Sequence, residues 1–453
     1  TTSEGLFVYD NGFGVAVQPG DLVRVGGVVK EYYDFTELAD VDSVSVCSSG
    51  HSVSAAAQDL PFSSEQVRET VEGMLVAFNE PLTVNETYNL ARYGEVLLSK
   101  GRRYVPTHNN DPGAAALAQQ NANGLNRILL DDASSVQNPA SIPYPAPELS
   151  ASNSLRVGDT VENLRGVIGY SFGEYRLYPV ETPQFIATNP RTSAPLLPGS
   201  GSLKVAGFNV LNYFNGDGQG GGFPTARGAS TEEEFQRQRA KTVSAILGSG
   251  ADIVGVVEIE NDGYGEFSAI ADLVNGLNSA LASPVYTYVD PGLEQLGSDE
   301  ITVGLIYRSD RVQPLGDAAA LDGYPFDDVT ALNRQPLLQG FTESATGEAV
   351  SVVINHFKSK GSCPGDGSLN DDHSDGQSCW NRIRTEAADA LMSWLGTASA
   401  TPGRVLILGD LNSYARENPI TTLTDGGYTD LLANFAGESV HSYVFSGESG
   451  YLD

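Results

Sequence analysis

The sequence predicts a protein of the α+β class, with a β-rich first part followed by a layered α/β second part. Up to about residue 180, apolar and polar residues alternate around glycines, which is the pattern of strands with one buried face. From residue 203 onward, short apolar runs alternate with segments of helical spacing, as in layered α/β domains. The stretch 181–202 carries four prolines, so we expect a linker there between residues 1–180 and 203–453.

The composition is strongly acidic. The chain of 453 residues carries 57 Asp and Glu against 26 Lys and Arg, which gives a formal net charge of −31. This charge favours solubility, attracts divalent cations and argues against nonspecific coating of nucleic acids. No run of about 18 apolar residues is present, so we expect no membrane partner, and we expect the chain to act as a monomer.

The chain has three cysteines. Cys363 and Cys379 bracket a polar loop that a disulfide could close, whereas Cys47 is left over as a free thiol or pairs outside this sequence. Low cysteine content with many Asn, Gly and Ser is typical of extracellular bacterial proteins, so we expect secretion. The loop is acidic; a solvated loop is the simpler interpretation, and a structural Ca²⁺ is the alternative. Its aspartates are Asp366, Asp371, Asp372 and Asp375.

An internal repeat is expected in the first part. The segment near 17–38 contains GDLV followed by a glycine and an aromatic pair, and the segment near 155–177 repeats this order with GDTV and one inserted residue. We interpret the two segments as copies of a small β-barrel-like unit, with the chain beginning inside the first copy. Residues 106–153 are rich in Asn, Ala, Pro and Ser and are expected to form loops.

The second part contains five clear strand candidates and two helices. Ser230 and Thr231 followed by three glutamates are a good helix start, and Gly248 can end that helix. A second amphipathic helix begins near Trp380 and reaches Trp394, and both tryptophans are expected in the core. The predicted strands are Lys204–Leu211, Asp252–Ile259, Ile301–Tyr307, Ser351–Phe357 and Arg404–Leu408.

Several of these apolar strands close on a polar residue. An unsatisfied buried polar group costs roughly 1–3 kcal/mol, so such residues need partners or a ligand. If the strands are neighbours, they assemble two carboxylates, two amides and an imidazole, an inventory that suits a hard cation such as Mg²⁺ or Mn²⁺ better than zinc. There is no Gly-x-Ser-x-Gly elbow and no Walker loop. The residues are Asn209, Glu258, His356, Asp410 and Asn412.

At these residues the chain resembles the endonuclease/exonuclease/phosphatase superfamily, and more closely the large secreted bacterial nucleases that join a β-rich region to such a domain. The resemblance implies a four-layered α/β sandwich for the second part and OB-like modules for the first. The matching segments, in family order, are GFNVLNYFN (207–215), RGASTEEEFQRQRAK (227–241), DIVGVVEIEN (252–261), ITVGLIYR (301–308), NHFKSKG (355–361), GDLNSYARENPI (409–420) and SGYLD (449–453).

The resemblance also implies roles for individual residues. Asn209 and Glu258 match the metal site, and His356 matches the histidine that contacts the scissile phosphate. Asp410 and Asn412 match the pair that orients the attacking water and the phosphate. The other matches are Asp453 as an acid that supports the site, Glu300 or its neighbour Asp299 as an acid that pairs with the catalytic histidine, and Arg227 and Arg237 as contacts to DNA phosphates. Lys358 and Lys360 beside His356 could meet flanking phosphates.

One departure from the family pattern concerns the C-terminus. The family ends in a Ser-Asp-His motif whose Asp–His pair is central to catalysis, but this sequence stops at Asp453 and none of its five histidines has that motif context. We therefore expect the catalytic domain to be C-terminally incomplete, and the chain as it stands to show little turnover.

Three functions remain open at the level of sequence. The first is a secreted, divalent-metal-dependent nuclease that hydrolyses phosphodiester bonds of DNA, or RNA, without sequence specificity. The second is a phosphatase or phospholipase-type phosphodiesterase, because fold alone does not separate these activities. The third is a non-catalytic binding protein. If the nuclease interpretation holds, bound metal and a few basic side chains must line the cleft to offset the net charge of −31.

Overall fold

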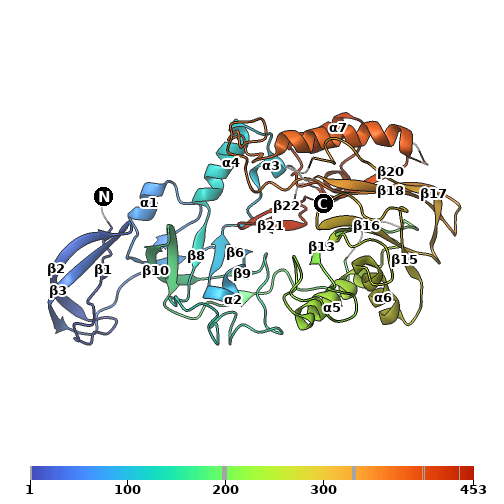
Figure 1. The fold of residues 1–453 in the computed structure, drawn as a ribbon. Coiled ribbons are helices and arrows are strands. Elements are labelled where there is room, and N and C mark those ends of the chain that lie inside the picture. The colour runs from blue at the N-terminus through green and yellow to red at the C-terminus, as the bar shows by residue number, and fades with distance from the viewer. Residues whose placement is uncertain are drawn as a thin grey trace. The chain divides into compact units, whose positions relative to one another are not determined.

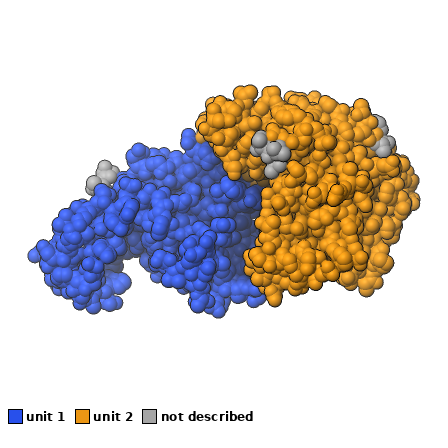
Figure 2. All heavy atoms as spheres, viewed as in Figure 1, with its two compact units in different colours: residues 1–105, 118–191, 443–449 blue, residues 106–117, 192–442, 450–453 orange. Residues whose placement is uncertain are grey.

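The structure is a computed structural model that describes residues 3–195, 201–328, 333–399, 401, 403–437 and 439–452. Helices and several separate sheets are present, which confirms the predicted mixed α and β class (Figure 1). The chain divides into two compact units, coloured in Figure 2: unit 1 comprises residues 1–105, 118–191 and 443–449, and unit 2 comprises residues 106–117, 192–442 and 450–453. None of the described helices is both long and apolar enough to cross a bilayer.

Unit 1 contains a nine-stranded sheet in the order β12-β9-β6-β7-β8-β11-β10-β5-β4. Its buried side chains form one hydrophobic cluster that includes Phe78, Leu98 and Ile168. The OB-like modules implied by the sequence stay a prediction. The strands are β4 (Ala56–Gln58), β5 (Leu75–Phe78), β6 (Leu82–Glu86), β7 (Val96–Ser99), β8 (Ile128–Leu130), β9 (Thr160–Val161), β10 (Leu164–Ser171), β11 (Glu174–Pro179) and β12 (Phe185–Ile186), with the short helices α1 (Glu65–Glu69) and α2 (Leu90–Tyr93) between them.

A three-stranded sheet precedes it in the sequence, with the order β1-β3-β2. β1 (Phe7–Val8) runs parallel to β3 (Phe35–Ser48), and β2 (Leu22–Tyr32) pairs with β3 as a long antiparallel hairpin. Most of its apolar side chains are exposed, as the burial pattern of β2 shows. This sheet therefore contributes little to the hydrophobic core of unit 1.

The two segments that the sequence pairs as a repeat adopt the same hairpin. Val29 lies opposite Leu38 in the first copy, and Ile168 lies opposite Leu177 in the second. The copies differ in burial, because Val29 is 63% exposed whereas Ile168 is 1% exposed. The hairpin is therefore buried against the hydrophobic core in the second copy and exposed to solvent in the first.

The prediction of loops over residues 106–153 is wrong for its first half. The structure has α3 (Pro106–Asn109) and α4 (Ala114–Leu125) there, followed by strand β8. The run of alanines that opens α4 has the highest helix propensity of any residue type, and this outweighs the polar composition of the segment.

The predicted division of the chain at a single linker is also wrong in two places. Residues 106–117 belong to unit 2, where Arg416 N donates to Thr107 O and Gly113 N donates to Asp375 O. Residues 443–449 belong to unit 1, where Ser449 N donates to Arg103 O and Arg103 pairs with buried Glu448. Long-range backbone pairing, which local sequence does not reveal, sets these boundaries. Of the predicted linker, residues 196–200 lie outside the described residues.

Unit 2 has the four layers that the sequence predicts, visible in Figure 1 as α7 over one sheet and α5 and α6 under the other. The first sheet has the order β13-β14-β16-β15 and the second the order β17-β18-β19-β20. A cluster of buried side chains between them includes Val303, Phe341 and Ile354. The strands are β13 (Val205–Tyr213), β14 (Ile253–Glu260), β15 (Tyr286–Tyr288), β16 (Ile301–Arg308), β17 (Val312–Ala320), β18 (Arg334–Glu343), β19 (Ala349–His356) and β20 (Val405–Asp410).

The helices of unit 2 cover the outer faces of these sheets. The predicted start at Ser230 and Thr231 is confirmed, because the Thr231 side chain caps α5 (Glu232–Ser249) by accepting from Glu234 N. The second predicted helix is α7 (Asn381–Ala398), which buries Leu391 and Leu395 against the second sheet. The remaining elements are α6 (Ala269–Leu281), α8 (Asn418–Asp425), α9 (Leu431–Ala436) and the short strands β21 (Tyr443–Phe445) and β22 (Glu448–Gly450).

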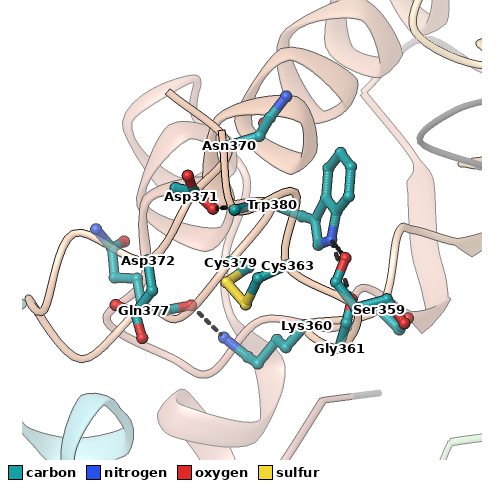
Figure 3. Close-up of a disulfide and its surroundings, with 12 residues drawn as sticks. Ser359, Lys360, Gly361, Cys363, Asn370, Asp371, Asp372, Gln377, Cys379 and Trp380 are labelled. Atoms are coloured by element: carbon teal, nitrogen blue, oxygen red, sulfur yellow. Dashed lines mark hydrogen bonds between the residues drawn. A yellow bond between two sulfur atoms is a disulfide. The ribbon is translucent and has the colours of Figure 1, made fainter. Parts of the chain in front are cut away.

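The predicted disulfide between Cys363 and Cys379 is present, with the two Cα atoms 5.4 Å apart (Figure 3). It closes the acidic loop, in which Asp371 accepts hydrogen bonds from the backbone amides of Gly365 and Gly367. The carboxylate thus caps the loop itself, and the structural Ca²⁺ stays a prediction. Cys47 is an exposed free thiol.

Removing this disulfide is expected to lower the free energy of unfolding by about 3 kcal/mol, because the bridge spans 16 residues and restrains the unfolded chain. The measurement is urea unfolding of the Cys363→Ala/Cys379→Ala double variant. The control is Cys47→Ala, which removes a thiol that closes no loop and should leave the midpoint unchanged. Equal stability of the double variant and the wild type would contradict a structural role for the bridge.

Candidate active site

Four polar residues of unit 2 lie just after points where its two sheets approach each other closely. A Cβ atom placed on Gly207 of β13 would lie 3.6 Å from the amide nitrogen of Gly409 in β20, so the strands of the two sheets approach closely just before these residues. A Cβ atom placed on Gly255 of β14 would lie 2.6 Å from the side chain of Ile354 in β19. The polar residues follow directly after these contacts and are Asn209 on β13, Glu258 on β14, His356 on β19 and Asp410 on β20.

Asn209 and Glu258 are hydrogen-bonded to each other. The Asn209 Nδ2 donates to Glu258 Oε1 at 3.0 Å, and the second carboxylate oxygen accepts from Asn212 N at 3.1 Å. Glu258, Leu211 and Asn212 all have left-handed backbone with φ of 63°, 56° and 49°. Non-glycine residues in this region cost of order 1–3 kcal/mol each and gather at functional sites.

His356 and Asp410 are directly paired across the parallel strands β19 and β20. Gly409 precedes Asp410 with a φ of 110°, and a Cβ there would lie 2.1 Å from Asn355 O. Only glycine fits this combination of left-handed backbone and close approach. The GDLN sequence therefore follows from packing, because the glycine lets β20 lie tightly against β19 and brings Asp410 beside His356.

His356 is buried and held neutral. Its side chain is 3% exposed, and within the described part of the chain its Nδ1 has no hydrogen-bond partner. Burial lowers the pKa of this imidazole well below 6.5, and the neighbouring cations Arg334 and Arg227 lower it further. A neutral imidazole at pH 7 can accept a proton or donate one hydrogen bond to a phosphate oxygen.

Asp410 and Asn412 are fixed by the turn that follows β20. Asn412 N donates to Asp410 Oδ1 at 2.8 Å, and Asn412 Nδ2 donates to Phe357 O at 3.0 Å. Asn412 has a left-handed φ of 49°. Both residues are 9% exposed, so their remaining oxygen atoms are held in set positions close to His356.

Two arginines flank His356 and share one acid. Arg227 NH2 lies 3.0 Å from Asp299 Oδ1, and Arg334 Nε donates to Asp299 Oδ2 at 2.8 Å. Arg334 is paired with His356 across the antiparallel strands β18 and β19, and a pocket opens beside Arg334 and Asp299. This cationic pair suits a phosphate oxygen next to the imidazole.

This arrangement corrects one prediction and adds one residue. Glu300 is exposed, and its neighbour Asp299 is the acid of the site, paired with arginines rather than with His356. Arg334 was missed, because no strand was predicted over β18. The sequence contains one signal for this strand, because a short apolar run directly follows Arg334 and Pro336.

Two of the remaining predicted basic residues, Arg237 and Lys360, do not lie at the site. Arg237 is exposed on α5, while its neighbour Gln238 donates to Val210 O and Leu211 O and so holds the backbone beside Asn209. Lys360 is ion-paired with fully buried Glu417, which gives it a structural role in place of the predicted phosphate contact.

The ammonium group of Lys358 lies close to the arginine pair but also has contacts of its own. Its ammonium group lies 4.9 Å from the Trp380 ring centroid and donates to Ser359 O at 3.0 Å. Burial and the cations Arg334 and Arg384 lower its pKa to about 8, so it stays mostly charged at neutral pH close to the arginine pair.

The last predicted residue, Asp453, lies outside the described residues. Its neighbour Leu452 is placed, and Leu452 O accepts from Leu411 N at 2.9 Å. Leu452 therefore lies beside the turn that carries Asp410 and Asn412.

The donor set fits a hard divalent cation better than a soft one. The described residues contain no group of three or more His, Cys, Asp or Glu that could hold a metal ion. Glu258 with the Asn209 amide supplies oxygen ligands of the kind Mg²⁺ takes, since Mg²⁺ keeps several waters and completes its shell with substrate phosphate.

The buried neutral His356 predicts a pH dependence of stability. Because its pKa in the folded protein lies well below 6.5, the unfolded chain takes up the proton first as the pH falls. The free energy of unfolding should therefore decrease as the pH drops below about 6.5, and His356→Gln should weaken this dependence. Urea unfolding between pH 5 and 7.5 measures it, with surface His51→Gln as the control. Parallel pH profiles for wild type and His356→Gln would contradict the burial of a neutral imidazole.

Fold and site together define a four-layered α/β protein with a polar site at the strand ends of both sheets. Residues 66–189 match a family model described as a domain of unknown function (DUF8508). No curated protein matches the chain.

Three of the solved structures that match part of the chain come from different organisms. The human Nocturnin catalytic domain with bound sulfate shares 14% identity over 53% of this chain and 77% of its own, with a TM-score of 0.35. An endonuclease/exonuclease/phosphatase family protein from Bacteroides thetaiotaomicron shares 17% over 50% and 69%, with a TM-score of 0.33. D. rerio TDP2 in complex with a single-strand DNA product shares 17% over 53% and 72%, with a TM-score of 0.30.

Proposed function

We propose that this protein is a secreted, divalent-metal-dependent nuclease of the endonuclease/exonuclease/phosphatase type that hydrolyses phosphodiester bonds of DNA without sequence specificity. One observation carries this assignment: the hydrogen-bonded pair Asn209–Glu258 on one sheet and the cross-strand pair His356–Asp410 on the other each lie within three residues of a point where the two sheets approach closely. The order of the seven sequence motifs supports the same class.

Each side chain of the site has a separate role in the hydrolysis. Asn209 and Glu258 would hold Mg²⁺ or Mn²⁺, which supplies Lewis-acid polarisation of the phosphoryl oxygen when bound. Asp410 accepts a proton from the attacking water, and Asn412 holds its carboxylate in place through the backbone hydrogen bond at 2.8 Å. His356 donates a hydrogen bond to the phosphate, and Arg227 and Arg334 offset the charge that develops on its oxygens.

A DNA substrate brings flanking phosphates, which a phosphomonoester lacks. Lys358 lies close to Arg334, so it can contact a phosphate next to the scissile one. Because the net charge of −31 repels DNA elsewhere, binding should depend on these cations and on the bound metal.

A substrate panel tests the proposal against its alternative, a phosphatase or phospholipase-type phosphodiesterase. A version of the protein that includes the C-terminal Asp-His motif implied by the family resemblance is incubated in Mg²⁺ or EDTA with supercoiled plasmid, p-nitrophenyl phosphate and glycerophosphocholine. Nicking of the plasmid in Mg²⁺ alone is the expected result. Turnover of the phosphomonoester or the headgroup without nicking would move the assignment to the alternative, and tight DNA binding in EDTA without turnover would favour a non-catalytic binding protein.

A further inference from the structure

The turns of the two repeated hairpins in unit 1 each begin with an aromatic residue. Tyr33 starts the turn between β2 and β3, and Phe172 starts the turn between β10 and β11. Their φ angles are 50° and 52°, and the next residues, Asp34 and Gly173, are also left-handed at 62° and 80°. Both turns therefore have the conformation that normally selects Asn or Gly at its first position.

Neither aromatic residue is explained by backbone preference or by burial, although the Arg176 guanidinium lies over one face of the Phe172 ring, 5.4 Å from its centroid. A left-handed conformation costs a bulky residue roughly 1–2 kcal/mol. Burial does not offset this cost, because Tyr33 is 79% exposed and Phe172 is 88% exposed. A strained position that persists although the side chain is not buried points to function.

The same feature occurs at equivalent positions of both copies, each with further aromatic rings beside it. The Tyr32 ring meets the Tyr33 ring edge-on at 4.7 Å, and the Tyr170 and Tyr175 rings meet at 4.9 Å beside the second turn. These rings present rigid, flat contact surfaces whose ordering costs little side-chain entropy.

The charges around the two turns disfavour a polyanion. The basic side chains close to them are already paired, Lys30 with Asp40 and Arg176 with Glu95 and Asp131. Residues 17–48 carry six acidic and two basic side chains. Phosphate binding requires uncommitted cations, so a ligand of flat rings without charge fits these surfaces better than a nucleic acid.

We propose that the turns at Tyr33 and Phe172 are a duplicated binding site for an uncharged polysaccharide. Sugar rings stack on aromatic faces through their C–H groups, and their hydroxyls donate to carboxylates such as Asp34. Two equivalent sites on one chain suit a polymer with a repeating unit, because the second contact is intramolecular once the first has formed. This binding is independent of the nuclease site in unit 2.

The test is retention of the full-length protein on microcrystalline cellulose, chitin and insoluble starch. The wild type should bind at least one of them, and the Tyr33→Gly/Phe172→Gly double variant should bind about tenfold or more weakly. Thermal unfolding of the double variant should occur at the same or a higher temperature, because glycine relieves the left-handed strain. The matched control is Tyr88→Gly, which removes a 78% exposed aromatic ring outside both hairpins.

Three results would overturn this site. The first is that the wild type is retained by none of the three polymers, and the second is that the double variant is retained as strongly as the wild type. The third is binding of an oligothymidylate in EDTA that the same double variant loses, which would make the turns stacking surfaces for bases.

Discussion

Replacing Asp410 with asparagine is expected to lower kcat for plasmid nicking by about 10²–10⁴-fold, the range for removal of a general base. The substitution leaves an oxygen that accepts from Asn412 N, so the turn after β20 keeps its geometry. What it removes is the charge and basicity of a carboxylate that is 9% exposed and paired with His356. The measurement is initial rates in Mg²⁺ at several plasmid concentrations, which separate kcat from KM.

The control for Asp410→Asn is Asp389→Asn, which removes an exposed carboxylate on α7. Both variants should have the same midpoint of urea unfolding as the wild type. A kcat for Asp410→Asn within a few-fold of wild type would mean that the GDLN turn does not carry the chemistry, and that the base must be sought elsewhere.

Gly409→Ala is expected to destabilise the protein by about 2–5 kcal/mol and to abolish nicking. The left-handed φ of 110° costs an alanine about 1–2 kcal/mol, and overpacking in a close-packed interior typically costs about 1–3 kcal/mol more. The new methyl group would lie 2.1 Å from Asn355 O, so β20 has to move away from β19. Asp410 would move with it and lose its place beside His356.

A second glycine separates backbone strain from the close approach. Gly427 has a φ of 99° but no atom within 4 Å of a Cβ placed there. Gly427→Ala should therefore lower the free energy of unfolding only by the cost of the left-handed backbone, and it should leave the nicking rate unchanged. Equal destabilisation of the two variants, measured by urea unfolding, would show that the packing of β20 on β19 is not what requires glycine at residue 409.

The sequence predicted the strands that carry Asn209, Glu258, His356 and Asp410 because each is a short apolar run with a polar residue at or near its end. It also predicted helix α5, whose cap and acidic first turn are local signals. These features depend on a few adjacent residues. Their alternation along the chain predicted a layered α/β domain, whereas the four layers were implied by the family resemblance.

Features set by long-range contacts were missed. Lys360 and Lys358 look alike in the sequence, but only Lys360 meets the buried Glu417, 57 residues further on. Arg334 reaches the site because β18 pairs with β19, and residues 106–117 join unit 2 through backbone bonds to segments near 375 and 416. Spacing and periodicity carry no information about such partners.

The central claim is that Glu258 and Asn209 hold the metal of a phosphodiesterase, and the most direct measurement is plasmid nicking by Glu258→Gln over a range of Mg²⁺ concentrations. The matched control is Glu260→Gln, on the same strand, where Glu260 accepts from Asn215 N. We expect Glu258→Gln to be about 100-fold slower at 1 mM Mg²⁺ and to recover partly at higher Mg²⁺, and Glu260→Gln to cleave as the wild type does. Cleavage by Glu258→Gln at the wild-type rate, or wild-type cleavage that persists in EDTA, would contradict the account.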